Sequence, residues 1–458
     1  MEKRVDIIGG GLAGSEAALQ LAADGFAVRL IEMRPFRTTG AHHGDKCAEL
    51  VCSNSLKSTK EASAAGMLKA ELKLLGSRLL AFALAVDREQ FASLVTDALV
   101  QAGVARIEAE VVGIDPSGAL IIEDAHHEES HILEDPAPFC IIATGPLTSP
   151  GFAESLRTLT GEDHLSFYDA AAPIVYADSL DHDVVFGQSR YEEGAGDYLN
   201  APFNKEEYEA FAQELIDARC VIKKEFETGD LFQACQPIEE IARKGFDAPR
   251  FGPLKPVGLV DPRTQKRPWA VVQLRAEGRD KQCYNLVGFQ TNLAFPEQER
   301  VFRMIPGLEQ AQFARYGVMH RNTFINSPAL LNHHLELQSA ASCALPVRLY
   351  VAGQLSGTEG YVEAIASGLL ASLSVRAAAR GIELDSLPRE SAFGALIDYA
   401  TDPETKDYQP MHVNFGILPP FEERIRNKQQ RYEAYAERGS EAMKSYVSAL
   451  GQLLEGTN

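Results

Sequence analysis

The sequence predicts an α/β fold in which a Rossmann-like domain with a parallel sheet is interrupted by an α+β insertion domain. Three observations predict it. The chain begins with a strand, a glycine-rich loop, a helix and a second strand; two later apolar strands each end in a turn of small residues; and the stretch between these two strands has a different composition. We expect the first part of the Rossmann-like domain at residues 1–150, the insertion at 151–328, and the second part, with C-terminal helices, at 329–458.

The start of the chain carries the most specific local pattern. A strand over Val5–Ile8 runs into a Gly-x-Gly-x-x-Gly loop, a helix follows over Ser15–Ala23, and a second strand over Ala27–Ile31 ends in Glu32. Such glycines let the backbone approach a pyrophosphate at the helix N-terminus, and the acidic residue can accept hydrogen bonds from a ribose 2′-OH. The pattern predicts a site for FAD or NAD, and disfavours NADP because Glu32 would repel a 2′-phosphate. The candidate contacts are Gly9, Gly10, Gly11, Leu12, Ala13, Gly14 and Glu32.

The next segment is expected to hold a helix over Asp87–Val100 and a meander of short strands over Ile107–Ile132. A charged turn in the meander carries His126, His127 and His131, which could be pictured as metal ligands. Because the turn is polar and offers no apolar wall to shape a site, we expect a solvated turn and no metal site.

Two later strands distinguish between the nucleotide ligands. Residues 139–145 and 349–353 each form an apolar strand with a small-residue end, and the second continues through a glycine-rich link into a long apolar helix from Tyr361 to about Ala379. The chain thus returns to the nucleotide site after the insertion, as in two-dinucleotide-fold flavoproteins, where the late helix points its positive end at the flavin. FAD is therefore the favoured cofactor. Its further candidate contacts are Gly353, Glu359, Gly360 and Tyr361.

The charge distribution of the insertion differs from that of the whole chain. The formal net charge is −20, which argues against a nucleic-acid partner, yet residues 241–281 contain ten basic and four acidic residues. Such a stretch could steer an anionic macromolecule to one face, and the alternative is a solvated basic loop. The candidate phosphate contacts are Arg243, Lys244, Lys255 and Arg267.

Composition limits the class of protein. A chain of 458 residues with 45% hydrophobic and 24% charged residues is typical of a globular protein with two or three domains. The sequence has no apolar run long enough to cross a bilayer, and it begins with a strand instead of a signal peptide, so we expect a cytoplasmic protein. Seven cysteines without CxxC spacing argue against a disulfide framework and against a zinc ribbon.

Two of these cysteines differ from the others. Cys52 lies in a polar insert soon after the first strand–helix–strand unit, and Cys235 lies just before the basic stretch. A thiol acts as a nucleophile in its thiolate form, which needs positive charge, a helix N-terminus or a base nearby. Pro237 suits a first helical turn, and Arg243 and Lys244 follow it, so Cys235 has such a setting. The alternative is that both thiols are inert.

Several long stretches match a known family over nearly the whole chain. They are Gly9–Ala18, Glu32–Pro35, Ala41–His43, Ala48–Leu56, Ala83–Arg88, Ala143–Ser149, Ser166–Asp169, Cys235–Gly245, Gly252–Gly258, Tyr316–Asn322, Val351–Gly368 and Asn414–Gly416. In these stretches the sequence resembles the bacterial folate- and flavin-dependent tRNA (uracil-5-)-methyltransferases, usually called TrmFO. A related family of flavoproteins that modify wobble uridines shares the architecture.

The resemblance implies a flavoenzyme that moves a methylene group from 5,10-methylenetetrahydrofolate to C5 of a uridine in the T-loop of tRNA, with NADPH or NADH as the reductant. It also implies two essential cysteines, which fall on Cys52 and Cys235. One thiolate would add to C6 of the uracil, and the other cysteine or Glu239 would remove the C5 proton; which group has which role stays open. A histidine is expected to stack on the pterin. The candidates are His42, His43 and His320.

Alternatives and departures from the family pattern remain. Some relatives methylate ribosomal RNA, so rRNA is a second possible substrate. Two other functions are an FAD-dependent NAD(P)H oxidoreductase without methyl transfer and a non-catalytic RNA-binding protein that keeps its flavin for structure. Where the family has Phe, this chain has Cys47, a third thiol five positions before Cys52 that could interfere with labelling or form a disulfide on oxidation.

Overall fold

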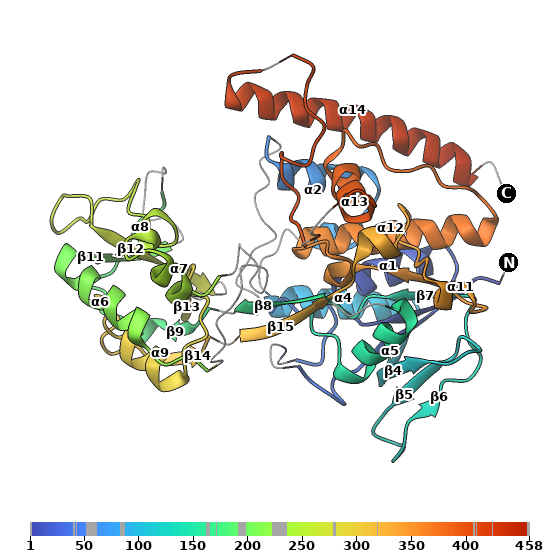
Figure 1. Cartoon of the computed structure of the whole chain (residues 1–458), viewed down its shortest axis with the longest axis horizontal. Helices are drawn as coiled ribbons and strands as arrows, with labels where there is room; N and C mark the ends of the chain where they lie inside the picture. Colours follow the sequence, from blue (N-terminus) through green and yellow to red (C-terminus); the bar gives the residue numbers. More distant parts are fainter. Residues whose placement is uncertain are drawn as a thin grey trace. The chain divides into compact units, whose positions relative to one another are not determined.

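The computed structural model of the chain divides into two compact units, unit 1 (Met1–Ser166 with Thr323–Asn458) and unit 2 (Phe167–Asn322), shown in Figure 1. The structure describes residues 2–39, 42, 44–51, 62–82, 88–161, 165–170, 172–190, 198–221, 236–277, 281–317, 319–405, 408, 410–423 and 425–455. The expected insertion at 151–328 differs from unit 2 at both ends. At the first boundary, helix α5 (Pro150–Thr160) belongs to unit 1 because its Phe152 and Leu156 are buried in the core of that unit.

A parallel five-stranded sheet forms the centre of unit 1. Its strands are β1 (Arg4–Ile8), β2 (Ala27–Glu32), β3 (Ala105–Glu108), β7 (Phe139–Ile142) and β16 (Arg348–Val351), in the order β16-β7-β1-β2-β3. Every neighbouring pair is parallel. The residues of β7 are all buried, as expected for a strand with other strands on both sides and helices on its faces. The predicted return of the late strand to the first sheet is confirmed.

Two helices that are far apart in the sequence pack together in unit 1. They are α1 (Leu12–Ala23) and α12 (Tyr361–Arg380), which lie side by side in Figure 1. A Cβ at Gly368 of α12 would come 2.2 Å from the Ala13 carbonyl oxygen, so glycine permits the close approach. By length and composition α12 could cross a membrane, but 94% of its apolar window is buried inside the protein. It is therefore a core helix, apolar on all sides.

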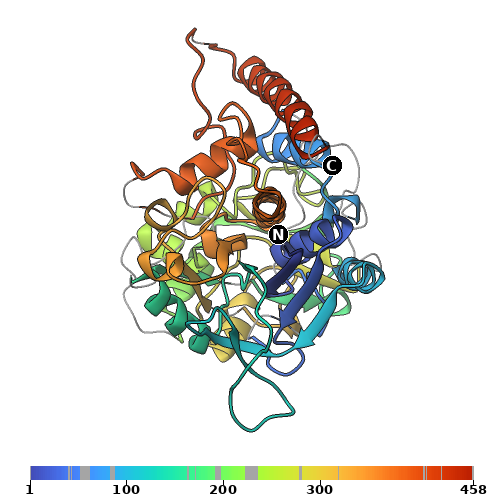
Figure 2. The same cartoon turned by 90° about the vertical axis from the view of Figure 1, so that its right-hand side faces the viewer.

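The C-terminal helices cover unit 1. Helix α14 (Lys428–Glu455) lies on the outer side of this unit in both views and packs against α2 (Ala64–Leu74) (Figures 1 and 2). The carboxylate of Glu71 on α2 accepts hydrogen bonds from the backbone N–H groups of Ala392 and Phe393, at 2.9 and 2.8 Å. These two residues begin α13 (Ala392–Thr401), so one buried carboxylate joins two helices that are distant in the sequence.

The expected helix before the meander is present, but the meander itself is shorter than predicted. Helix α4 spans Arg88–Gln101. Strand β3, at the start of the expected meander, instead joins the parallel sheet beside β2. The antiparallel part consists of β4 (Glu110–Ile114), β5 (Leu120–Glu123) and β6 (His131–Ile132).

Unit 2 is an antiparallel sheet with helices, in agreement with the predicted α+β class. The strand order is β10-β11-β12-β13-β9-β14. The bounds are β9 (Ile174–Tyr176), β10 (Phe186–Gly187), β11 (Tyr198–Phe203), β12 (Ala270–Glu277), β13 (Cys283–Leu286), β14 (Phe313–Arg315), α6 (Lys205–Asp217), α7 (Ile238–Lys244), α8 (Ala248–Phe251) and α9 (Phe295–Phe302). The unit has its own core, in which Phe203, Phe211 and Phe289 are buried. The chain crosses between the units along β8 (Leu165–Ala170) and β15 (Met319–Phe324), which pair with each other.

Candidate functional site

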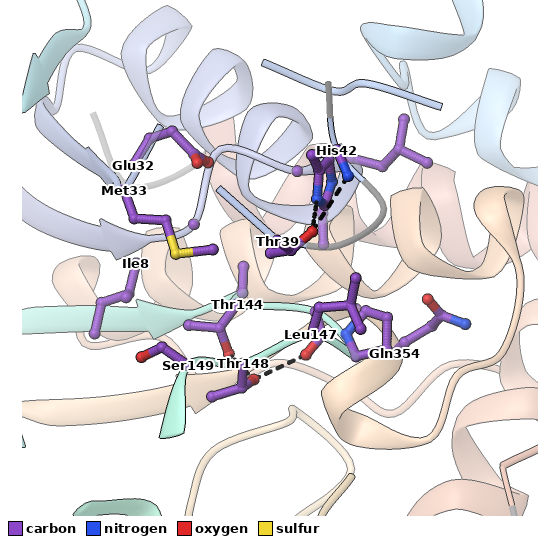
Figure 3. Close-up of a pocket in the computed structure, with 18 of the residues that line it drawn as sticks. Ile8, Glu32, Met33, Thr39, His42, Thr144, Leu147, Thr148, Ser149 and Gln354 are labelled. Atoms are coloured by element: carbon purple, nitrogen blue, oxygen red, sulfur yellow. Dashed lines mark hydrogen bonds between the residues drawn. The ribbon is translucent and has the colours of Figure 1, made fainter. Parts of the chain in front are cut away.

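A pocket lies at the carboxyl ends of the parallel strands of unit 1 and encloses about 1050 Å³, open solvent included. Ligands bind at this edge in open α/β sheets. The segments that follow β1, β2, β7 and β16 all contribute to its wall (Figure 3). Of the predicted cofactor contacts, the wall includes Gly9, Gly11, Leu12, Ala13, Glu32, Gly353, Gly360 and Tyr361, and it does not include Gly10, Gly14 or Glu359.

The glycines of the first loop have different roles. Gly9 has a φ of +100°, and a Cβ at this position would come 2.5 Å from the Ala143 carbonyl oxygen on the neighbouring strand end. A Cβ at Gly14 would come 1.9 Å from the Gly9 carbonyl oxygen. A Cβ at Gly11 would meet no atom of the described residues within 4 Å. Gly9 and Gly14 therefore allow close backbone packing, whereas Gly11 leaves space beside the pocket.

The N-terminus of α1 opens into this space. Gly11 is the N-cap of the helix and has no side chain to accept a hydrogen bond from the first turn. The next residues, Leu12 and Ala13, also line the pocket. Because the first N–H groups of a helix have no partner within the helix and lie at its positive end, this arrangement can bind a phosphate group.

Glu32 lines the pocket and is held in place by its neighbours. Its carboxylate accepts hydrogen bonds from the Gly10 N–H at 2.7 Å and from the Arg34 guanidinium at 2.8 Å. Burial alone would raise the pKa of Glu32, but the hydrogen bond and positive charge of Arg34 outweigh it and leave the pKa below its ordinary value. The ionised oxygens have lone pairs left for another donor. Acceptance of a ribose hydroxyl by Glu32 stays a prediction.

Sequence reasoning missed Arg34. The side chain is 3% exposed and joins two acids, because its second pairing is with Glu49 at 2.9 Å. Arg34, Glu49 and Glu32 all line the pocket. The signal in the sequence was the stretch Glu32–Pro35, which matches the family, but nothing in it indicates that Glu49 would be the second partner.

His42 is the pterin candidate that the described structure places in this pocket. Its Nδ1 lies 2.6 Å from the Thr39 hydroxyl oxygen, and both residues line the wall (Figure 3). His43 lies outside the described residues, and the side chain of His320, on β15, is also outside them. A role for any of the three in binding the pterin stays a prediction.

The two candidate cysteines, Cys52 and Cys235, lie outside the described residues. Cys47 is described and is fully buried, with its thiol below the glycine loop: a Cβ at Gly10 would lie 3.0 Å from its sulfur. Burial raises the pKa of Cys47 to about 11, so the thiol stays protonated at neutral pH. Burial and the raised pKa both disfavour reaction of this thiol in the folded protein.

Glu239 is a buried carboxyl group in the first turn of α7. Its oxygens accept hydrogen bonds from the Thr291 hydroxyl at 2.9 Å and from the Asn292 N–H at 2.6 Å. Burial raises the pKa of Glu239 to about 7, a value that suits a general base. The side chain is 0% exposed, however, and both oxygens bind unit 2 itself. The geometry therefore fits a residue that fixes the start of α7, and a role as base stays a prediction.

The four candidate RNA contacts differ in their surroundings. Arg243 forms an ion pair with Glu240 and donates to the Ile216 carbonyl oxygen at 3.2 Å. Lys244 donates to the side-chain oxygen of Gln236 at 3.0 Å. Lys255 and Arg267 are exposed residues of the segment between α8 and β12. Arg243 is thus partly engaged in holding α6 and α7 together.

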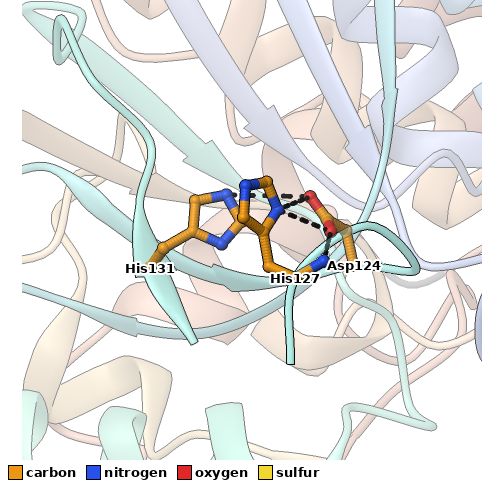
Figure 4. Close-up of side chains that lie close together, drawn as sticks. All are labelled: Asp124, His127 and His131. Atoms are coloured by element: carbon orange, nitrogen blue, oxygen red, sulfur yellow. Dashed lines mark hydrogen bonds and ion pairs between the residues drawn. The ribbon is translucent and has the colours of Figure 1, made fainter. Parts of the chain in front are cut away.

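The histidine-rich turn of unit 1 brings two of its three histidines to one carboxylate (Figure 4). His127 Nδ1 lies 2.9 Å and His131 Nε2 lies 3.7 Å from oxygens of Asp124. The hydrogen bond from His127 lowers the pKa of Asp124 to about 2. The two imidazole side chains are 54% and 31% exposed, so the turn is in contact with solvent, as expected. The cluster connects the two ends of the β5–β6 turn.

Comparison with known proteins gives concordant matches. A family model described as glucose inhibited division protein A matches residues 4–383. The methylenetetrahydrofolate–tRNA-(uracil-5-)-methyltransferase TrmFO of Moorella thermoacetica is 48% identical over 97% of this chain and 98% of that protein. The protein of the same name from Listeria monocytogenes is 46% identical over 98% of this chain and 100% of that protein. The solved structure of Aquifex aeolicus GidA in the form I crystal has a TM-score of 0.67 and 18% identity, and it covers 100% of this chain and 79% of that chain. The last match supports the fold.

Proposed function

Because the chain belongs to the TrmFO family, we propose that it transfers a one-carbon unit from 5,10-methylenetetrahydrofolate to C5 of a uridine in the T-loop of tRNA. FAD is the bound cofactor, NADPH or NADH supplies the electrons, and the enzyme works in the cytoplasm. The observation that carries the proposal is the identity of 46–48% with proteins of that name along almost the entire length of both chains.

The pocket of unit 1 has the features that FAD needs. The first N–H groups of α1, next to Gly11, would hold the pyrophosphate, and Glu32 would accept from the ribose. The open space beside Gly11 is where a ligand can approach the backbone. Gly360 and Tyr361, at the N-terminus of α12, would hold the opposite part of the cofactor. When bound, the flavin supplies the redox chemistry that completes the methyl group.

The chain's own thiols activate the uracil. C5 of uracil is a poor nucleophile until a thiolate adds to C6 and pushes electron density toward C5. C5 then bonds to the one-carbon unit, whose carbon–nitrogen bonds to the folate carrier break, a base removes the proton from C5, and the thiolate leaves C6. Cys52 and Cys235 are the candidates for nucleophile and base. The second cysteine is favoured over Glu239 as the base because both oxygens of Glu239 bind Thr291 and Asn292.

His42 is the favoured partner of the pterin. An imidazole is flat and can stack on a ring system, and His42 lies in the wall of the same pocket as the residues that would hold the flavin. The hydrogen bond between its Nδ1 and the Thr39 hydroxyl oxygen fixes the orientation of the ring.

The test is incubation of the purified enzyme with unmodified tRNA transcript, methylenetetrahydrofolate and NADPH, followed by nucleoside analysis. We expect 5-methyluridine from the native enzyme, none from Cys52→Ala or Cys235→Ala, and a normal yield from Cys343→Ala, whose thiol is exposed. All variants should keep their yellow flavin. NADPH consumption without methylated product would support an oxidoreductase instead. If, in a parallel incubation, an rRNA transcript were methylated and the tRNA transcript were not, the substrate would be rRNA.

A further inference from the structure

Phe251 at the end of α8 is exposed to solvent to an unusual degree. The residue is 79% exposed, and among the described residues no large hydrophobic side chain is more exposed. A single exposed apolar side chain is common on protein surfaces and needs no explanation by itself. Two further features, however, distinguish Phe251: the hydrogen bonds that hold its backbone and the cationic residues near its ring.

The backbone that carries Phe251 is fixed to the core of unit 2. The Gly252 and Leu254 N–H groups both donate to the Pro249 carbonyl oxygen, at 3.1 and 2.8 Å. Leu254 is 0% exposed, and its own carbonyl oxygen accepts from the Val271 N–H on β12 at 3.1 Å. The backbone that displays the ring is therefore held by hydrogen bonds, so a partner that binds the ring has to order the side chain but not the backbone.

One cationic group lies beside this ring, and two lysines lie on residues connected to it. The Arg250 guanidinium lies 5.9 Å from the centre of the Phe251 ring and 3.6 Å from the centre of the Trp269 ring, and it also donates to the Trp269 carbonyl oxygen at 3.1 Å. Lys205 Nζ lies 5.8 Å from the same Trp269 ring. The exposed Lys255 belongs to the same turn, because its N–H donates to the Gly252 carbonyl oxygen at 3.3 Å. Asp247 pairs with Arg250 at 3.2 Å, and the Arg250 side chain is 16% exposed.

We infer that this aromatic platform, formed by Phe251, Arg250, Trp269 and Lys255, binds an unpaired nucleotide of the RNA substrate outside the target uridine. The inference rests on the proposed function for the presence of RNA. The base stacks on the Phe251 ring, and the neighbouring phosphates lie against the cationic side chains. Proteins that recognise RNA loops combine an aromatic face for the base with positive charge for the backbone. A protein partner fits less well, because a single aromatic residue is much smaller than a stable protein interface.

Binding of tRNA transcript to the FAD-loaded full-length enzyme tests the inference. Phe251→Ala should weaken affinity by about tenfold, the scale of one stacked base, and should raise the KM for tRNA while kcat stays the same. The slope of log affinity against log salt should stay unchanged, because stacking releases no counterions. Lys255→Ala should instead reduce that slope by about 1.

Matched variants make the outcome clear. Phe251→Tyr should keep the native affinity for tRNA, because tyrosine also has an aromatic ring. The control is Val100→Ala, which should leave the affinity for tRNA unchanged, since Val100 is a 71% exposed apolar residue in unit 1. Trp269, the only tryptophan of the sequence, lies against Arg250, so its fluorescence follows binding independently of activity. If Phe251→Ala bound tRNA with the affinity of the native enzyme, and the native enzyme made 5-methyluridine, the proposed role of the platform would be wrong and the proposed function would stand. Absence of both tRNA binding and methylated product from the native enzyme would overturn the proposed function.

Discussion

Gly11 and Gly14 of the loop after β1 have opposite surroundings. A methyl group at position 14 would overlap the Gly9 carbonyl oxygen, whereas within the described part of the chain a methyl group at position 11 would meet no atom within 4 Å. We expect Gly14→Ala to lose roughly 1–3 kcal/mol or more of stability through overpacking. Gly11→Ala should fold normally but bind FAD more weakly, because its methyl group projects beside the pocket. Thermal unfolding and FAD titration measure the two effects, and equal stability of both variants would contradict the packing argument.

Thiol reactivity follows burial at the residue scale. Cys47 is fully buried and its pKa is raised to about 11, whereas Cys343 is exposed. We expect iodoacetamide at neutral pH to modify Cys343 in the folded protein and to leave Cys47 unmodified until denaturant is added. Mass spectrometry of peptides reads out both sites. Rapid modification of Cys47 in the native protein would show that the loop above it opens.

At the scale of elements, Glu71 makes the junction of α2 and α13 sensitive to pH. Burial raises the pKa of Glu71 to about 7, above the value near 4.3 of an unfolded chain. Between these values the folded protein keeps a proton that the unfolded chain loses, so this group's contribution to stability falls as the pH rises. The destabilisation caused by Glu71→Gln should therefore be larger at pH 5 than at pH 8, by roughly 1–3 kcal/mol.

Thermal unfolding of the holoenzyme at the two pH values measures this difference. Glu437→Gln is the matched control, since Glu437 is exposed on α14 and its replacement should change stability little at either pH. A destabilisation by Glu71→Gln that grows with pH would contradict the assignment.

The basic residues of unit 2 have different roles in different elements. Arg243 links α7 to the end of α6 through the Ile216 carbonyl oxygen, while Lys255 and Arg267 are exposed beyond α8. Arg243→Ala should therefore lower the melting temperature of the protein. Replacement of both Lys255 and Arg267 by Ala should leave the melting temperature unchanged and reduce the salt slope of tRNA binding by about 2. An unchanged salt slope in the double variant would place the phosphate contacts elsewhere.

Over the whole molecule, the sequence predicts elements that are encoded locally better than it predicts contacts between distant segments. The strands and helices around the glycine loop and at 349–379 were predictable because spacing of glycine and apolar residues encodes them locally. The pairing of Arg34 with Glu49 and that of Glu71 with Ala392 join segments that the sequence gives no reason to connect. The sequence pattern places the end of β3 in the meander because a strand of four residues carries too little pattern to reveal its sheet. Burial of Glu239 likewise depends on the loop at Thr291, far along the chain.

The sheet of unit 1 also sets an order of events during synthesis. Strand β16 and helix α12 leave the ribosome long after β1 and α1. Helix α12 packs against α1 in the folded protein. Unit 2, whose core is made from residues 172–311, is complete before them. A nascent chain can therefore close the insertion first, while the first strands of the flavin pocket still lack their later partners. The wall of the pocket is complete only after Ala364, the last residue that lines it, has emerged.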